Sequence, residues 1–194
     1  MRKSREETAA TRQRIVESAA AQFLQNGIAA TGLSDLMGAA GLTHGGFYRH
    51  FESKDQVVTE SCAAALDSWA DKIEAASTKS RSKRRGLASV AESYLSPEHR
   101  DDPAQRCPLA ALGSELARSG EPTREVATEG LRRLINVIAA QMPDPGSKMA
   151  SAHAITALST MVGALTLSMI VTDRGLSDRI LMEAKAHVSL LEAA

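Results

Sequence analysis

Two short helices joined by a glycine turn are predicted by residues 30–55, which read ATGLSDLMGAAGLTHGGFYRHFESKD. Within 33–40 the apolar residues recur at i, i+3, i+4 and i+7, which is the spacing of one helix face. Gly41 then supplies the left-handed step that commonly ends a helix, and Thr43 is a suitable N-cap for the next one. This pattern is typical of a helix-turn-helix, here over about 32–51.

The second of these helices, ending near Phe51, is too short to be stable alone, because isolated helices under about 12 residues are marginal in water. Phe47 and Phe51, four positions apart, are therefore predicted to pack inward. That orientation leaves a polar face toward solvent or nucleic acid, formed by Thr43, His44, Gly45, Tyr48, Arg49 and His50.

The residue types on this polar face suit contacts with a nucleic-acid backbone. Tyr48 and His50 can donate hydrogen bonds to phosphate oxygens, while Arg49 and Lys54 can neutralise their charge. A packing role is the alternative for Tyr48. For the whole segment 31–54, the alternative is an ordinary helical hairpin with a solvated face.

Two glycines, Gly45 and Gly46, occur in the same short helix. Each costs about 1 kcal/mol relative to alanine, and a local conflict of that size indicates a functional demand. Without side chains at these positions, backbone amides at the helix N-terminus can approach a phosphate.

Longer helices are predicted on both sides of the motif. An apolar stripe favours a helix over about 8–26, which Gly27 ends. Ser53 and Gln56 form a predicted capping box, each side chain satisfying the other's free amide, at the start of a helix reaching about residue 76. The basic residues near the N-terminus either contact DNA or form a solvated tail; they are Arg2, Lys3, Arg5 and Arg12.

The composition predicts an all-α fold. Hydrophobic residues make up 43% of the chain and aromatic residues only 3%, so alanine and leucine, both good helix formers, carry the apolar surface. A polar, basic loop is expected at 77–86. Proline and glycine separate the remaining predicted helices, which lie near 87–96, 108–118, 122–141, 149–172 and 177–192, for about nine in all.

Charge and cysteine usage bound the compartment and the partners. The net charge is zero, but residues 1–54 hold seven Lys/Arg against five Asp/Glu, which permits phosphate binding. Cys62 and Cys107 show no disulfide spacing, so a reducing, cytoplasmic setting is expected. No apolar run reaches the roughly 18 residues of a membrane span; the longest candidate, 157–171, is interrupted by Ser and Thr and is expected to be a buried or interfacial helix. The histidines lack metal-ligand spacing, so neither a metal nor a cofactor is expected.

The segment from Ile15 to Lys54 resembles the TetR/AcrR family of bacterial transcriptional regulators, above all in ATGLSDLM, AGLT and GGFYRHFESKD. The resemblance implies two domains: a DNA-binding domain over 9–69 and a larger helical ligand-binding and dimerisation domain over 70–194. Within the first, it implies three sets of DNA contacts: phosphates held by Tyr48, His50 and Lys54, the groove met by Thr43, His44 and Gly45, and backbone or base contacts from Thr31 and Ser34.

Two positions depart from the family pattern. The family often has lysine where this chain has His44, and threonine, serine or alanine where it has Gly46. Because both differences remove potential base or phosphate contacts, the operator sequence of a relative cannot be transferred to this chain.

The resemblance further implies that the last two helices form a four-helix dimer interface across a two-fold axis. The apolar stripes of these helices fit that role through Leu158, Val162, Leu165, Leu181 and Val188. Packing within one subunit is the alternative explanation of the same stripes. Two recognition helices about one DNA turn apart would read a palindrome, and a small molecule in the body would shift their separation.

Three residues outside the helix-turn-helix are candidates for an effector site. Cys107 precedes Pro108, so its sulfur is expected at a helix N-terminus beside Arg106, where a thiol pKa falls and reactivity rises. Trp69 and Met161 are candidates for lining an apolar pocket. The alternative for all three is an ordinary place in the core.

The sequence therefore predicts a homodimeric DNA-binding repressor, not an enzyme, released from a palindromic double-stranded operator by a small-molecule or electrophile effector. A helical interaction module without DNA binding is the main alternative. An enzyme dependent on Cys107 is the other, although no local nucleophile signature supports it.

Overall fold

The computed structural model describes residues 5–78 and 86–191, apart from the side chains of 76–78 and 104. Every regular element within those ranges is helical, which confirms the all-α prediction. The predicted N-terminal residues Arg2 and Lys3 lie outside the described residues, as do Lys83, Arg84 and Arg85 of the predicted basic loop.

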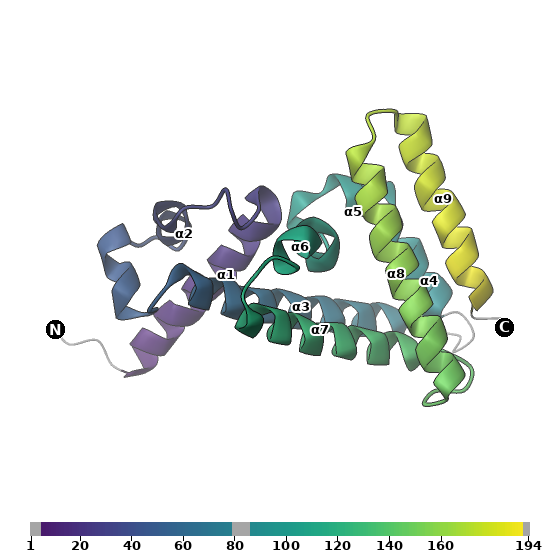
Figure 1. Ribbon diagram of the computed structural model, residues 1–194, viewed down its shortest axis with the longest axis horizontal. Coiled ribbons are helices and arrows are strands. Elements are labelled where there is room, and N and C mark those ends of the chain that lie inside the picture. Colours follow the sequence, from purple (N-terminus) through teal and green to yellow (C-terminus); the bar gives the residue numbers. More distant parts are fainter. Residues whose placement is uncertain (1–4, 79–85, 192–194) are drawn as a thin grey trace.

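One end of the molecule, here called the head, contains the predicted helix-turn-helix (Figure 1). It is built from α1 (Arg5–Asn26), α2 (Leu33–Ala39), the 3-10 helix η1 (His44–Arg49) and the first part of α3 (Lys54–Thr78). The rest of the chain, here called the body, comprises α4 (Gly86–Tyr94), α5 (Pro97–Asp101), η3 (Pro103–Gln105), α6 (Pro108–Leu116), α7 (Glu121–Ala139), α8 (Lys148–Ile170) and α9 (Arg174–Leu191).

The predicted helices begin and end within three residues of the observed ones. The structure differs from the prediction in two other respects. The helix after Thr43 is a 3-10 helix rather than an α-helix. The short elements α5 and η3 were not predicted, because Pro97 and Pro103 were interpreted only as breaks. Proline is tolerated in the first turn of a helix, where its missing N–H has no partner to lose.

The predicted capping box before α3 is confirmed for one of its two hydrogen bonds. The backbone N–H of Gln56 donates to Oγ of Ser53 at 3.2 Å. The Gln56 side chain, however, accepts from the backbone N–H of Glu52 at 2.8 Å and not from Ser53. The side chain therefore reaches one residue farther back than a capping box requires.

Two hydrophobic cores share the long helix α3. Its first turns contribute Val57, Val58 and Cys62 to the core of the head, while Leu66 and Ile73 lie in the core of the body. The proposed boundary between 69 and 70 therefore falls inside a continuous helix, and the division into 9–69 and 70–194 stays a prediction.

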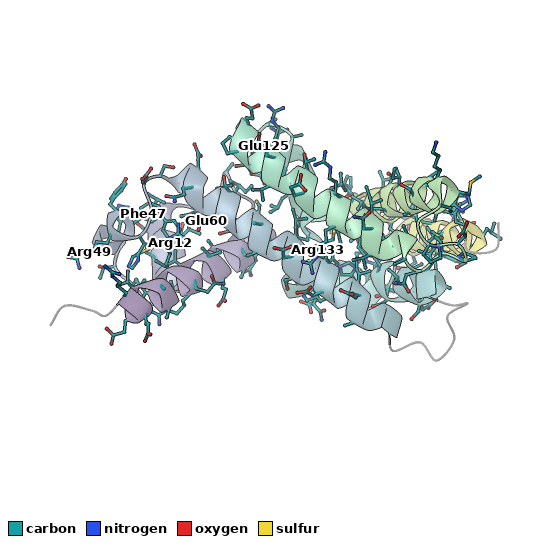
Figure 2. The ribbon with its side chains drawn as sticks, turned by 90° about the horizontal axis from the view of Figure 1, so that it is seen from below. Arg12, Phe47, Arg49, Glu60, Glu125 and Arg133 are labelled. Atoms are coloured by element: carbon teal, nitrogen blue, oxygen red, sulfur yellow. The ribbon has the colours of Figure 1, made fainter. Side chains whose placement is uncertain are left out.

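Helix α7 lies alongside α3 over much of its length (Figure 1). The closest approach is at Gly130, where an added Cβ would lie only 2.7 Å from Cδ1 of Leu66. On the outer side of the same pair, Arg133 of α7 forms ion pairs with Asp67 and Asp71 of α3 (Figure 2). A glycine thus allows the two helix backbones to come close together.

At the opposite end, α8 and α9 pack as an antiparallel pair (Figure 1). Helix α8 is long and apolar enough to cross a membrane, judged by its length and mean hydropathy alone, even though Ser and Thr residues interrupt its apolar run. Yet Ala154, Met161 and Leu165 of this helix are fully buried in the core of the body. Helix α8 therefore packs as a core helix of the body.

Candidate nucleic-acid interface

The helix-turn-helix rests on an aromatic anchor. Phe47 is fully buried and Phe51 nearly so, as predicted, with ring centroids 5.8 Å apart. Met37 of α2 and Ile15 of α1 are fully buried in the same core. Because η1 is too short to be stable alone, this packing fixes its orientation.

The turn between α2 and η1 has the predicted left-handed glycine. Gly41 has φ +70°, and its N–H donates to the carbonyl of Gly38 at 2.9 Å. The N–H of Leu42 donates to the carbonyl of Met37 at 2.8 Å, which ends α2. Thr43 occupies the N-cap position of η1, but its side chain accepts no capping hydrogen bond. Its hydroxyl therefore lies exposed at the helix start.

Most of the predicted contact residues form one exposed surface, here called the η1 face, composed of Ser34, Thr43, His44, Gly45, Tyr48 and Arg49. The exposed fraction of Tyr48 is 69%, although its edge-on ring pair with Phe47 brings the two centroids to 5.2 Å. Oγ of Ser34 lies 3.3 Å from Nδ1 of His44, which links α2 to η1. Tyr48 therefore does not have the packing role that was its alternative.

Neither glycine of η1 is required by the fold. Gly45 and Gly46 have ordinary backbone angles. A Cβ on Gly45 would meet nothing within 4 Å, and one on Gly46 would make only a 3.5 Å contact with Met37. The conformational cost of two glycines thus has no explanation in packing, and what remains is room for an approaching molecule.

One predicted contact residue does not reach the surface. Thr31 is only 2% exposed, and its hydroxyl donates to the carbonyl of Gly27 at 2.6 Å. The hydroxyl stabilises the connection between α1 and α2, so Thr31 is not part of the η1 face. The sequence could not distinguish this local bond from a contact with DNA.

Two other candidates are half-buried at the edge of the η1 face. Nζ of Lys54 donates to the carbonyl of Ile28 at 2.8 Å, which holds the ammonium beside the α1–α2 connection. The carbonyl of His50 accepts from Nε of Arg12 at 3.2 Å. Both residues therefore also tie the motif to the rest of the head.

Arg12, considered with the N-terminal basic residues as a DNA contact, is half-buried between helices of the head (Figure 2). Its guanidinium forms an ion pair with both carboxylate oxygens of Glu60 in α3. The same group lies 4.4 Å from the ring centroid of Phe51. Arg12 thus joins α1 to α3 and to the end of η1, whereas Arg5 is exposed at the start of α1.

The body contributes a residue that sequence reasoning missed. The carboxylate of Glu115 in α6 accepts from the backbone N–H groups of Ile28 at 3.2 Å and Ala29 at 2.8 Å. Gly27, with φ +85°, lies directly before them, and an added Cβ there would be 3.1 Å from the same carboxylate. No periodic pattern links residues this far apart in the sequence.

Comparison with known proteins identifies the family of this head. Residues 15–60 match the model described as bacterial regulatory proteins, tetR family. The probable acrEF/envCD operon repressor of Escherichia coli K12 is 42% identical over 59 residues, 30% of this chain and 27% of that protein. The HTH-type transcriptional regulator TtgR of Pseudomonas putida is 40% identical over 68 residues, 35% of this chain and 30% of that protein. Within residues 15–60 this chain is thus similar to the tetR family of bacterial regulatory proteins.

The likeness of this chain to solved structures extends over both head and body. The reduced form of NemR from Escherichia coli aligns with a TM-score of 0.77 at 19% identity, covering 92% of this chain and 95% of that one. A TetR regulator from Chloroflexus aurantiacus aligns with a TM-score of 0.76 at 24% identity, covering 95% of each chain. These similarities concern the fold, and the sequence matches to the two regulators named above span less than a third of their length.

The body of the protein contains a cavity of about 390 Å³. Trp69, a predicted effector residue, lines it. Met161 is fully buried within the core and is not among the lining residues, so that prediction is not supported. The apolar periodicity of α8 could not show which of its methionines line the cavity.

Cys107 lies at the N-cap of α6, as predicted, but it is fully buried. Burial raises the pKa of its thiol, although the neighbouring hydroxyl of Tyr94 and the backbone of Ala110 oppose the rise. The sequence predicted a lowered pKa and a reactive thiolate for Cys107, and the direction of this pKa shift is wrong. The effect of burial on the thiol exceeds the effect of its position at a helix N-terminus. Burial also raises the pKa of the Cys62 thiol, to about 11.

The predicted dimer stripe lies mainly inside this chain. Leu158, Leu165, Leu181 and Val188 are buried in the core of the body, and Val162 is partly buried against it. A different set of apolar side chains is exposed on α8 and α9, namely Met149, Ile155, Leu167, Ile170, Leu176, Met182 and Leu190. Because α8 is apolar on nearly all sides, its periodicity could not separate core from surface.

No group of three or more metal-ligating side chains comes together within 5–78 and 86–191.

Proposed function

We propose that this TetR-family protein is a transcriptional repressor that binds double-stranded operator DNA through the η1 face. The observation that carries the proposal is the exposed Tyr48, with Arg49 and Gly45 beside it, on a helix held from behind by buried Phe47. An arginine and a phenol can contact phosphates while a glycine lets the backbone approach the groove. The names of the curated relatives, a probable operon repressor and a transcriptional regulator, support the same conclusion.

The proposed operator is palindromic and is bound by a homodimer. Support comes from the exposed apolar side chains of α8 and α9, such as Leu167 and Met182, which water would otherwise contact. A two-fold pair would present two η1 faces to one side of a duplex, with half-sites about 34 Å apart. Because the protein must reach DNA, we assign it to the cytoplasm.

The direct test measures binding to the DNA that flanks the protein's own gene, by fluorescence anisotropy at several salt concentrations. Arg49→Ala should weaken binding and reduce the salt slope by about one unit of log K per log salt, because one phosphate contact is lost. Arg132→Ala, an exposed arginine of α7, is the matched control and should change neither. Wild-type affinity and slope in the Arg49 variant would favour an interaction module without DNA binding.

The dimer is tested by sedimentation of Leu167→Lys, which should give monomers with much weaker operator binding. Leu131→Lys, at an exposed apolar position of α7, should remain dimeric. A monomeric wild-type protein that still binds a palindrome would contradict this part of the proposal.

We further propose that a small molecule in the cavity beside Trp69 shifts the population toward a state with low DNA affinity. We assign Cys107 no catalytic role, because its thiol is buried and its pKa is raised. This leaves ligand binding, rather than covalent chemistry at the thiol, as the means of release.

A further inference from the structure

Three aromatic rings meet at one wall of the cavity in the body. The ring centroids of Trp69 and His99 lie 5.1 Å apart, those of Tyr94 and His99 4.8 Å, and those of Trp69 and Tyr94 5.9 Å. Ile73 and Val90 add aliphatic surface to the lining. The volume of about 390 Å³ falls within the roughly 300–1,000 Å³ of small-molecule sites.

One hydrogen bond fixes the protonation of the His99 ring. Its Nδ1 lies 2.6 Å from the backbone carbonyl of Tyr94. A carbonyl oxygen only accepts, so Nδ1 carries the hydrogen and donates it. Burial lowers the pKa of His99 and favours the neutral ring, with Lys72 acting in the same direction and Asp102 and the carbonyls of Tyr94 and Gln105 opposing it. In the neutral ring, Nε2 is then an acceptor.

Within the described part of the chain this acceptor forms no hydrogen bond, although the backbone of Gln105 lies close enough to the ring to affect its pKa. His99 is only 7% exposed. The hydroxyl of Tyr94 and the indole N–H of Trp69 are donors on the same wall, and among the described residues they too form no hydrogen bond, although both lie near the thiol of Cys107. A buried acceptor left unpaired costs free energy, which a donor arriving with a ligand would recover.

The charges at the cavity argue against an ionic ligand. Lys72 is accompanied by the carboxylates of Glu98 and Asp102 in the lining, so an anion would find no excess of positive charge. An organic cation would compete with Nζ of Lys72, which already lies 5.2 Å from the centroid of the Trp69 ring. An uncharged ring compound fits these surroundings best.

We propose that this cavity binds an uncharged aromatic molecule bearing a hydroxyl group, which donates its hydrogen to Nε2 of His99 while its ring packs against Trp69. The inference rests on the proposed function, since it names the chemical class of the effector. It can nevertheless be tested without DNA.

The test is isothermal titration calorimetry of the full chain with three naphthalene probes of similar size at pH 7.5. 2-Naphthol carries a donor, 2-methoxynaphthalene keeps the oxygen but lacks the donor, and 2-naphthoate is an anion. We expect 2-naphthol to bind at least tenfold more tightly than either of the others. Equal affinity for the methoxy compound, tighter binding of the anion, or no binding of 2-naphthol would overturn the proposal. Because the comparison uses the wild-type chain, it does not depend on whether a variant folds.

A variant then locates the contact. His99→Phe keeps a ring but removes the acceptor, so 2-naphthol should lose its advantage while the affinity for 2-methoxynaphthalene stays the same. His99→Gln, which retains an acceptor, should recover part of the 2-naphthol affinity. A 2-naphthol advantage that persists in His99→Phe would overturn the assignment to Nε2. If 2-naphthol binds as expected but does not change operator affinity, the ligand site is upheld and the effector role in the proposed function fails. If the protein binds its operator but not 2-naphthol, DNA binding is upheld and this ligand site fails.

Discussion

The carboxylate of Glu115 accepts a 2.8 Å hydrogen bond from the backbone N–H of Ala29, and this contact ties the body of the protein to its head. Ile28 donates to the same carboxylate. Helix α6, which carries Glu115, also places Leu112 and Leu116 in the core of the head. The α1–α2 connection is thus positioned by a helix whose N-cap is Cys107, next to the rings of the cavity.

Glu115→Gln should lower the free energy of unfolding by about 1 kcal/mol, because a hydrogen bond to a charged group is replaced by a neutral one. Glu115→Ala should cost more, since both N–H groups lose their partner. The measurement is urea denaturation followed by circular dichroism. Arg118→Gln, at an exposed position just after α6, serves as the surface control, and an equal loss in that variant would refute the role of Glu115.

Arg12→Lys should destabilise the head by about 1 kcal/mol even though the charge is kept. Lysine cannot contact both carboxylate oxygens of Glu60 and also lie flat against the ring of Phe51. Denaturation of the purified variant gives the value. Arg133→Lys, where the ion pairs with Asp67 and Asp71 are on the surface, should lose less; a reversed order would contradict this account.

Gly130→Ala should destabilise the protein although alanine is the better helix former. The gain in helix propensity is about 1 kcal/mol. It is opposed by the close approach of the new Cβ to Leu66, at 2.7 Å from Cδ1 and 2.8 Å from Cβ, and overpacking of this kind costs roughly 1–3 kcal/mol. Gly113→Ala in α6, where the added Cβ meets nothing within 4 Å, should be neutral or stabilising in the same thermal melts.

Stability should fall as the pH is lowered below 6.5, and His99 should account for part of the loss. Burial lowers the pKa of His99 in the folded state, so the unfolded chain takes up a proton first. Unfolding is therefore favoured between pH 6.5 and the lowered pKa, with a slope of at most about 1.4 kcal/mol per pH unit for this group.

Denaturation midpoints of the wild type, His99→Gln and the exposed-histidine control His187→Gln at pH 7.5, 6.5 and 5.5 check this expectation. The His99 variant should lose part of the pH dependence and the His187 variant none of it. Identical pH profiles for all three proteins would rule out the contribution of His99.

The head was largely predictable because its determinants are local. The spacing from Leu33 to Ala40, the left-handed Gly41 and the pair Phe47 and Phe51 specify α2, the turn and the orientation of η1 within about twenty residues. Thr31 shows the limit of this reasoning, since a hydroxyl that bonds to a carbonyl four residues earlier has the same sequence signature as one that faces DNA.

The body was predictable in its helices but not in their faces. Leu158 and Leu165 of α8 were expected at a dimer surface and are buried, because a helix with apolar residues on nearly all sides gives no direction to its periodicity. Cys107 was expected to be reactive, but its burial depends on residues of other helices. The contact of Glu115 with Ala29 likewise depends on tertiary structure alone.

The continuous helix α3, which supplies side chains to both cores, has a mechanical consequence. A flexible linker would let the head and the body reorient freely, whereas a continuous helix transmits a rotation of one to the other. Any tilt of the η1 face relative to the body must therefore bend α3 or move α6 relative to α3. In the function proposed above, the stiffness of α3 would set how far a molecule bound in the body turns the η1 face.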